Sequence, residues 1–156
     1  RGDFADITQD ALWACCMTYL SEVCNFLGDV ARADKLYRLL LPYAGHNIVA
    51  GNAVACYGAA SRYLGLLATT MSRWEEAEEH FKDALEMNAR MGAKPWLAHT
   101  QHDYANMLLI RGQAGNYEKA MSLLDEALAT SHELGMKSLE EKILSLKTKR
   151  AKKGQD

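Results

Sequence analysis

The chain has 156 residues and a formal net charge of −2 at pH 7, with 49% hydrophobic and 24% charged residues. These values predict one soluble domain with a real core and argue against a protein built to hold nucleic acid. No apolar run approaches the roughly 20 residues of a membrane span, and no signal peptide or lipidation motif occurs, so we expect a cytoplasmic location. Only two prolines interrupt a sequence rich in Ala, Leu, Glu and Met, which predicts an all-α fold.

A first helix pair is predicted within residues 11–47. The segment "WACCMTYLSEVCNFLGD" reads as its first helix and "DVARADKLYRLLL" as its second, and Asp29 is placed to cap the second. Four residues of the second helix share one face at helical spacing: Val30, Ala33, Tyr37 and Leu40. The four cysteines have the spacing of neither a disulfide framework nor a zinc site, so we expect reduced thiols in the core.

A second pair is predicted within residues 52–92, with its first helix over residues 53–70. In "SRWEEAEEHFKDAL" the same face recurs, and Ser72 is placed as its N-cap. The residues of that face are Trp74, Ala77, Phe81 and Ala84. The acidic residues between them point away from this stripe, so we interpret them as a solvated helix face and not as acid–base catalysts.

A third pair is predicted within residues 96–134, formed by "WLAHTQHDYANMLLIRG" and "NYEKAMSLLDEAL", with Asn116 as N-cap. The face recurs as Tyr117, Ala120, Leu124 and Ala127. His99 and His102 stand three residues apart on a helix, but the sequence places no third metal ligand, so we expect no metal site. A helix over about residues 136–146 follows; it either caps the last pair or begins another repeat. Residues 147–156 form a basic tail.

The central alanines of the three second helices stand at positions 33, 77 and 120, which are 44 and 43 residues apart. Small residues let two helices approach closely, and large ones fill the space between successive pairs. Because one pair cannot cover its own apolar face, neighbouring pairs must stack. The spacing therefore predicts a single helical-repeat domain over residues 1–146.

This small–large pattern of paired helices resembles the tetratricopeptide repeat (TPR) over about residues 11–134, with a period longer than that family's usual 34 residues. The resemblance implies a right-handed α-solenoid of three repeats plus a C-terminal capping helix. The segments "LYRLLLPYAGHN" and "YGAASRYLGLLA" are also similar to the TPR-like C-terminal regions of large bacterial regulatory ATPases, among them LuxR-type regulators and cyclase-associated proteins. That second resemblance implies a fragment of a signalling or transcription-regulatory protein.

The TPR resemblance also implies where a partner binds, because the first helix of each pair lines a concave groove. The groove positions by this analogy are Thr18, Glu22, Asn25, Ala59, Arg62, Leu66, His99, His102 and Asn106. Arg62 is the one fixed positive charge among them; it either holds a carboxylate of the partner or pairs internally with an acid such as Glu22.

The expected function is non-catalytic protein–protein interaction, with a peptide or another domain of the parent chain in the groove. We expect no cofactor and no catalytic residue, because no phosphate-binding or nucleophile motif occurs. An alternative from a different class is a small-molecule effector-sensing arm of a signalling ATPase. Self-association through the ends of the solenoid is a further alternative, whereas nucleic-acid and membrane partners are not expected.

Overall fold

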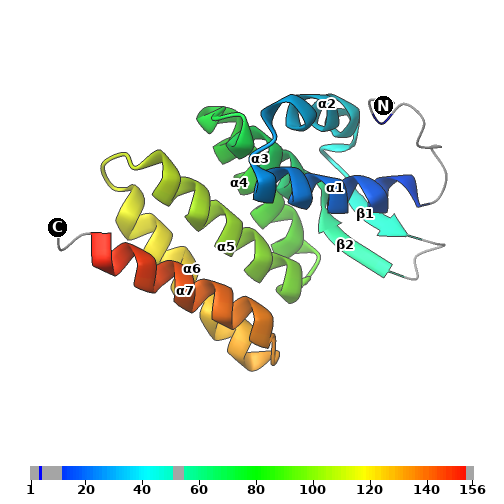
Figure 1. The fold of residues 1–156 in the computed structure, drawn as a ribbon. Coiled ribbons are helices and arrows are strands. Elements are labelled where there is room, and N and C mark those ends of the chain that lie inside the picture. Colours follow the sequence, from blue (N-terminus) through cyan, green and yellow to red (C-terminus); the bar gives the residue numbers. More distant parts are fainter. Residues whose placement is uncertain (1–3, 5–11, 51–54, 154–156) are drawn as a thin grey trace. The chain divides into compact units, whose positions relative to one another are not determined.

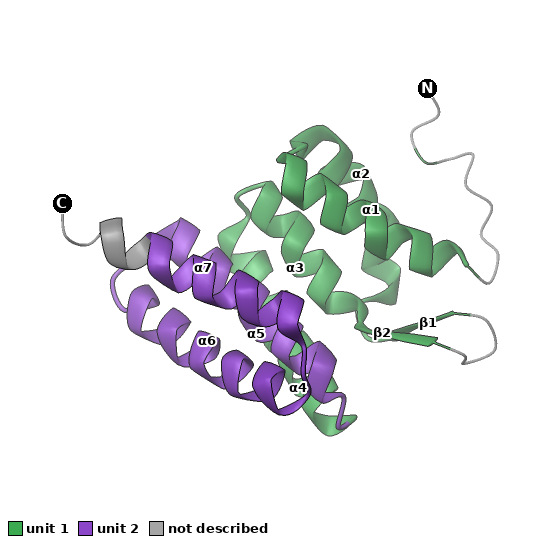
Figure 2. Cartoon of the chain, turned by 60° about the horizontal axis from the view of Figure 1, so that its bottom comes forward, with its two compact units in different colours: residues 1–91 green, residues 92–156 purple. Residues whose placement is uncertain are grey.

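The computed structural model describes residue 4, residues 12–50 and residues 55–153, with the side chains of residues 150–153 left out. These residues form seven α-helices and one short hairpin (Figure 1). The prediction of an all-α helical-repeat fold is confirmed. The chain divides into two compact units, residues 1–91 and residues 92–156 (Figure 2), and each is described by itself.

Unit 1 holds two helix pairs joined by the hairpin. The first pair is α1 (Trp13–Leu27) and α2 (Val30–Leu40), followed by a 3-10 turn, η1 (Leu41–Tyr43). The second pair is α3 (Ala60–Thr70) and α4 (Trp74–Arg90). Helix α3 packs against α1, α2 and α4. All its residues from Ala60 to Thr69 are consequently buried.

The turn between α1 and α2 follows the sequence closely. Gly28 ends α1 with φ 65°, a left-handed conformation that glycine adopts without steric cost. The Asp29 carboxylate then accepts a hydrogen bond from the backbone N–H of Arg32 at 3.0 Å, so its predicted role as N-cap of α2 is confirmed. This bond and the Arg32 guanidinium lower the pKa of Asp29.

Close approach of α3 and α4 depends on a glycine. A Cβ placed on Gly65 would lie 2.9 Å from three ring atoms of Phe81, and the Phe81 side chain is fully buried. The alanines of the predicted face, Ala77 and Ala84, are fully buried as well. The small and large residues predicted to share one face of this pair therefore do pack between α3 and α4.

A polar cluster links α2 to α4. The Tyr37 hydroxyl lies 3.0 Å from Glu76 Oε2 and 2.8 Å from His80 Nε2, and Arg73 pairs with Asp34 at 2.9 Å. Burial and the Glu76 carboxylate raise the pKa of Tyr37 to about 12, and burial lowers the pKa of His80. His80 Nδ1 is buried without a hydrogen-bond partner among the described residues, which fits a neutral ring protonated on Nε2.

The helix predicted over residues 53–70 is wrong in its first part. Strands β1 (Asn47–Ala50) and β2 (Ala55–Ala59) pair antiparallel there, and α3 begins only at Ala60. Gly58, with φ 77°, is left-handed and Ala59 is extended, so the chain cannot continue as a helix through them. The ladder is irregular between Asn47 and Val49, consistent with a bulge beside such a glycine.

Unit 2 is formed by α5 (Lys94–Arg111), α6 (Asn116–Glu133) and α7 (Lys137–Lys153). Helices α5 and α6 form a closely packed pair, and α7 packs on α6 and also contacts α5. Three small residues of the predicted pattern are fully buried: Ala105, Ala120 and Ala127. Helix α7 extends to Lys153, so the first part of the predicted basic tail is helical.

Several local predictions are corrected by the structure. Ser72 does not cap α4: it adopts φ 57°, and Arg73 occupies the cap position. Asn116 is the first residue of α6, and its side-chain amide donates to the Leu108 carbonyl at the end of α5. Tyr117, expected to fill the space between successive pairs, is 49% exposed, whereas Leu124 of the same face is fully buried.

The cysteine prediction holds for half of the set. All four are free thiols, but only Cys15 and Cys24 are buried. Burial and the nearby Asp29 carboxylate raise the pKa of Cys24, which keeps its thiol protonated and unreactive. Cys16 and Cys56 are exposed, Cys16 on the outer face of α1 and Cys56 in β2.

Candidate functional site

The strongest candidate site in unit 2 is a groove of about 430 Å³ between α5 and α7. We call it the α5–α7 groove. Its lining is His102 and Asn106 from α5, and Ser138, Glu141, Lys142, Ser145, Leu146 and Lys149 from α7. Two of the nine predicted groove residues therefore line an actual cavity.

Helical spacing sets both walls of the groove. His102 and Asn106 stand four residues apart, so they share one face of α5, while Tyr104 and Ala105 turn into the core. On α7, Leu139 and Ile143 are buried and hold the helix against its neighbours. Lys147 pairs with Asp125 of α6, which adds a polar tether. The side of α7 next to this buried face, with Lys142, Ser145 and Lys149, faces the groove.

Most side chains that line the groove are polar, and its charged residues are two lysines and one glutamate. Lys142 and Lys149 are exposed on α7, and Glu141 is the one acid of the lining. His102 Nδ1 lies 3.0 Å from Asp103 Oδ1, a contact that fixes the ring and leaves Nε2 as its second polar atom. The Asn106 amide offers both donors and an acceptor. Such a lining can bind carboxylates and main-chain amides.

The third predicted residue of this repeat, His99, is not part of the groove lining. It is half-buried, with its ring 5.5 Å from that of Trp96, centroid to centroid. The Trp96–His99 contact explains its position: the ring packs along α5 one turn before His102.

The six predicted groove residues of unit 1 are used mainly for packing. Thr18, Ala59 and Leu66 are buried, and the Thr18 hydroxyl donates to the Cys15 carbonyl. The Asn25 side chain accepts a hydrogen bond from Thr70 Oγ1 at 3.1 Å, which links α1 to the end of α3. These side chains are already engaged inside unit 1.

Of the two alternatives for Arg62, the structure shows the internal ion pair. Arg62 Nη1 lies 3.1 Å from Glu22 Oε1, with the arginine side chain 5% exposed and the glutamate 46%. The guanidinium also lies over the Tyr63 ring at 4.9 Å. A partner's carboxylate would have to displace Glu22 to reach it.

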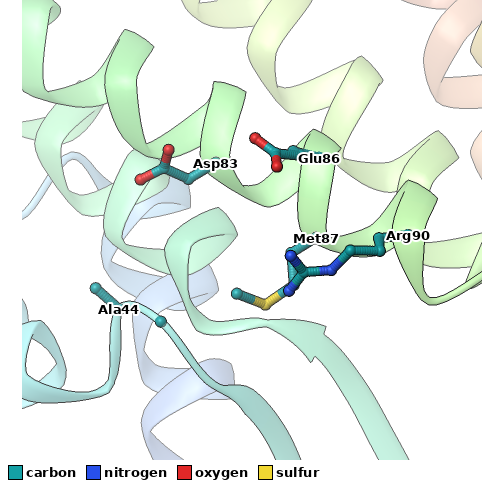
Figure 3. Close-up of a pocket in the computed structure, with 6 residues that line it drawn as sticks. Ala44, Asp83, Glu86, Met87 and Arg90 are labelled. Carbon is teal, nitrogen blue, oxygen red and sulfur yellow. The ribbon is translucent and has the colours of Figure 1, made fainter.

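A second, smaller pocket of about 210 Å³ lies in unit 1 (Figure 3). Asp83, Glu86, Met87 and Arg90 of α4 form one side, and the segment at Ala44 and Gly45 forms the other. Acidic and basic side chains share this small space, and none of the predicted groove residues lies in it.

The α7 side of the main groove was missed from the sequence. From the sequence, the helix over about residues 136–146 either caps the last pair or begins another repeat, and Lys149 falls in the basic tail. A signal was present: if α7 is the first helix of another repeat, its polar face must line the same groove as α5. Its contacts with both α5 and α6 fit that alternative.

The residues that the structure describes form neither a metal site nor a membrane span. No group of three or more His, Cys, Asp or Glu residues in that part of the chain is arranged to hold a metal ion. Likewise, none of the helices that the structure describes has the length and apolar character needed to cross a bilayer.

Comparison with known families gives one match. Residues 57–133 match the family model described as Tetratricopeptide repeat. No curated protein matches the chain, and no solved structure matches it. The matched residues run from within β2 to the end of α6 and include two of the three alanine-centred faces, those at positions 77 and 120. The match supports a domain of the TPR type in this chain, a fold that is typically a non-catalytic module and generally mediates protein–protein interaction.

Proposed function

We propose that this chain is a non-catalytic interaction module that binds an extended, acidic polypeptide segment in the α5–α7 groove. The observation that carries the proposal is the composition of that groove: two exposed lysines, His102 and Asn106 surround one cavity. Lysine charges attract acidic side chains, and an asparagine amide can bond both the N–H and the C=O of a peptide backbone.

The lining favours a polypeptide over a small-molecule effector. Small-molecule sites are usually lined predominantly by apolar and aromatic side chains that enclose the ligand. Leu146 is the one aliphatic hydrophobic residue among those lining the α5–α7 groove, and the ring in that lining is the polar imidazole of His102. A polar segment crossing the two helices satisfies such a lining better than an enclosed metabolite does.

The partner is either a separate protein or another domain of the same parent chain. The similarity of "LYRLLLPYAGHN" and "YGAASRYLGLLA" to regions of bacterial regulatory ATPases supports a cytoplasmic regulatory parent. A nucleotide-binding region or a helix-turn-helix in the flanking sequence tests this part of the proposal. Flanking sequence with neither of them, or with a secretion signal, counts against it.

The groove is tested with a displayed library of random peptides selected against the whole chain. We expect the enriched peptides to be rich in Asp and Glu. Their affinity should fall at least about tenfold for His102→Ala/Asn106→Ala, which removes hydrogen-bonding groups, and for Lys142→Glu/Lys149→Glu, which reverses two charges.

Lys137→Glu is the matched control, because Lys137 is an exposed lysine of the same helix that lies outside the groove lining. This variant should bind as the wild type does. Equal loss of affinity in the control and the groove variants would show a general charge effect. Selection of neutral or basic peptides that tolerate the groove variants would contradict the proposal.

A further inference from the structure

The outer face of α1 carries an exposed apolar stripe, and the contact that it makes within unit 1 is the edge-on contact of Tyr19 with the Tyr57 ring of β2, at 5.8 Å between centroids. Leu12, just before the helix, begins it, and the spacing that follows is four, three, four and three residues. The stripe consists of Leu12, Cys16, Tyr19, Val23 and Phe26, and every one of these residues is exposed. At 100° per residue they fall within an arc of about 80°. We call these five residues the α1 stripe.

The exposure is large for side chains of this kind. Phe26 is 88% exposed and Val23 is 52% exposed. Between Leu12 and Leu27 the one charged residue is Glu22, and its carboxylate is held by Arg62. An exposed stripe of large apolar side chains marks an interaction site more often than a solvated surface.

The repeat shows what kind of element covers such positions. The sequence offset of 44 residues relates Tyr19 to Tyr63 and Val23 to Leu67 of α3. Tyr63 and Leu67 are buried in unit 1, where α3 packs against α1, α2 and α4. In α3, neighbouring helices bury the positions that correspond to the exposed Tyr19 and Val23 of α1. We therefore expect a helix to cover the α1 stripe.

We propose that this helix is α1 of a second copy of the chain, and that the protein forms a two-fold symmetric dimer through the α1 stripe. Alternating spacings of four and three residues form the seam by which helices pack on their like. In a two-fold interface the same patch serves both copies, so one stripe is sufficient.

The distribution of apolar surface argues against end-to-end stacking. Outside residues 12–30, the exposed large hydrophobic residues of the described chain are scattered over different elements: Leu41, Val49, Met91, Ile110, Tyr117, Leu134 and Leu144. Helix α7 contributes only Leu144 to this set. No second stripe among the described residues matches the α1 stripe, so its best apolar counterpart is itself.

The expected dimer is weak. A 15-residue helix is about 22 Å long, and two such faces bury on the order of 1,000 Å² in total, near the lower limit for specific interfaces. We therefore expect a dissociation constant in the micromolar range, on the order of 10 µM. The α1 stripe lies outside the α5–α7 groove, so dimerisation and peptide binding can be tested separately.

Sedimentation of the whole chain over a range of concentrations tests the proposal. We expect a monomer–dimer equilibrium whose dissociation constant rises at least about tenfold in Val23→Glu, since a charge must then enter an apolar contact. Leu144→Glu is the matched control, because Leu144 is 51% exposed on α7. It should dimerise like the wild type, as should His102→Ala/Asn106→Ala.

Phe26→Asp serves as a second variant with little risk to folding, and circular dichroism verifies the helicity of each protein. Thiol labelling adds an independent readout: Cys16 should become protected as the protein concentration rises, while the exposed Cys56 should not. A wild type that stays monomeric, or dimers that persist in both Val23→Glu and Phe26→Asp, would overturn the proposal. A stripe covered by a different protein, with no homodimer, would overturn it too.

Discussion

Replacing Gly65 by alanine tests the packing of α3 on α4. In an exposed helix the change stabilises the protein by about 1 kcal/mol, because alanine is the better helix former. Here the new Cβ lies 2.9 Å from the Phe81 ring, about 0.6–1 Å inside normal carbon–carbon contact. Overpacking a buried site costs about 1–3 kcal/mol, so after the gain of about 1 kcal/mol in helix propensity we expect a net loss of up to about 2 kcal/mol.

The assay is urea unfolding followed by far-ultraviolet circular dichroism. In a Phe81→Leu background the ring is gone, and Gly65→Ala should become neutral or stabilising, with a coupling of about 2 kcal/mol between the two sites. Gly45→Ala is the control, because no atom lies within 4 Å of the added Cβ and the expected change is within about 0.5 kcal/mol. A stabilising Gly65→Ala in the wild-type background would refute the packing argument.

Three further changes probe unit 1. Asn88 is fully buried and accepts a hydrogen bond from the Ala59 N–H at 3.2 Å, so Asn88→Ala should cost about 2 kcal/mol in urea unfolding; no loss would remove that role. Arg62→Ala should lower the free energy of unfolding by about 1–2 kcal/mol, a modest loss because the exposed Glu22 carboxylate is then solvated by water. An unchanged free energy of unfolding would show that the Arg62–Glu22 ion pair does not stabilise the fold. The pKa of His80 is lowered by burial, so its contribution to stability is complete above the unfolded-state pKa near 6.5 and declines as pH falls below it. His80→Gln should flatten this decline, and an identical pH profile would contradict the assignment.

Local periodicity explains why the helices could be predicted. Ala33, Ala77 and Ala120 each occupy the fully buried centre of a second helix, because spacing along one helix determines which residues share a face. Asp29 was predictable for the same reason: an N-cap needs information from one turn of chain only.

The hairpin could not be predicted this way. Strand β1 is four residues long, and its partner β2 lies beyond the next four residues. The left-handed conformation of Gly58 interrupts the predicted helix, and helical spacing along the sequence does not reveal that conformation. The sequence of β2 looked like the start of a helix because Ala55 and Ala59 fit either structure.

Of the two walls of the α5–α7 groove, the one formed by α5 could be predicted from the sequence. His102 and Asn106 follow from their place on the first helix of a pair, but the α7 wall depends on how that helix packs. The sequence left open whether Arg62 binds a carboxylate of the partner or pairs with Glu22. In the structure it is buried and pairs with Glu22. Contacts between distant segments are set by tertiary packing, which local pattern does not determine.

The most direct test of the proposed groove is a two-dimensional ¹⁵N NMR titration of the whole chain with a selected acidic peptide. We predict shifts in the side-chain amide of Asn106 and in the backbone amides of the groove residues of α5 and α7. Amides near Ala44 and the 210 Å³ pocket of α4 should stay unchanged. Shifts confined to that pocket or to the α1 stripe, with Asn106 unaffected, would contradict the proposal that the α5–α7 groove is the binding site.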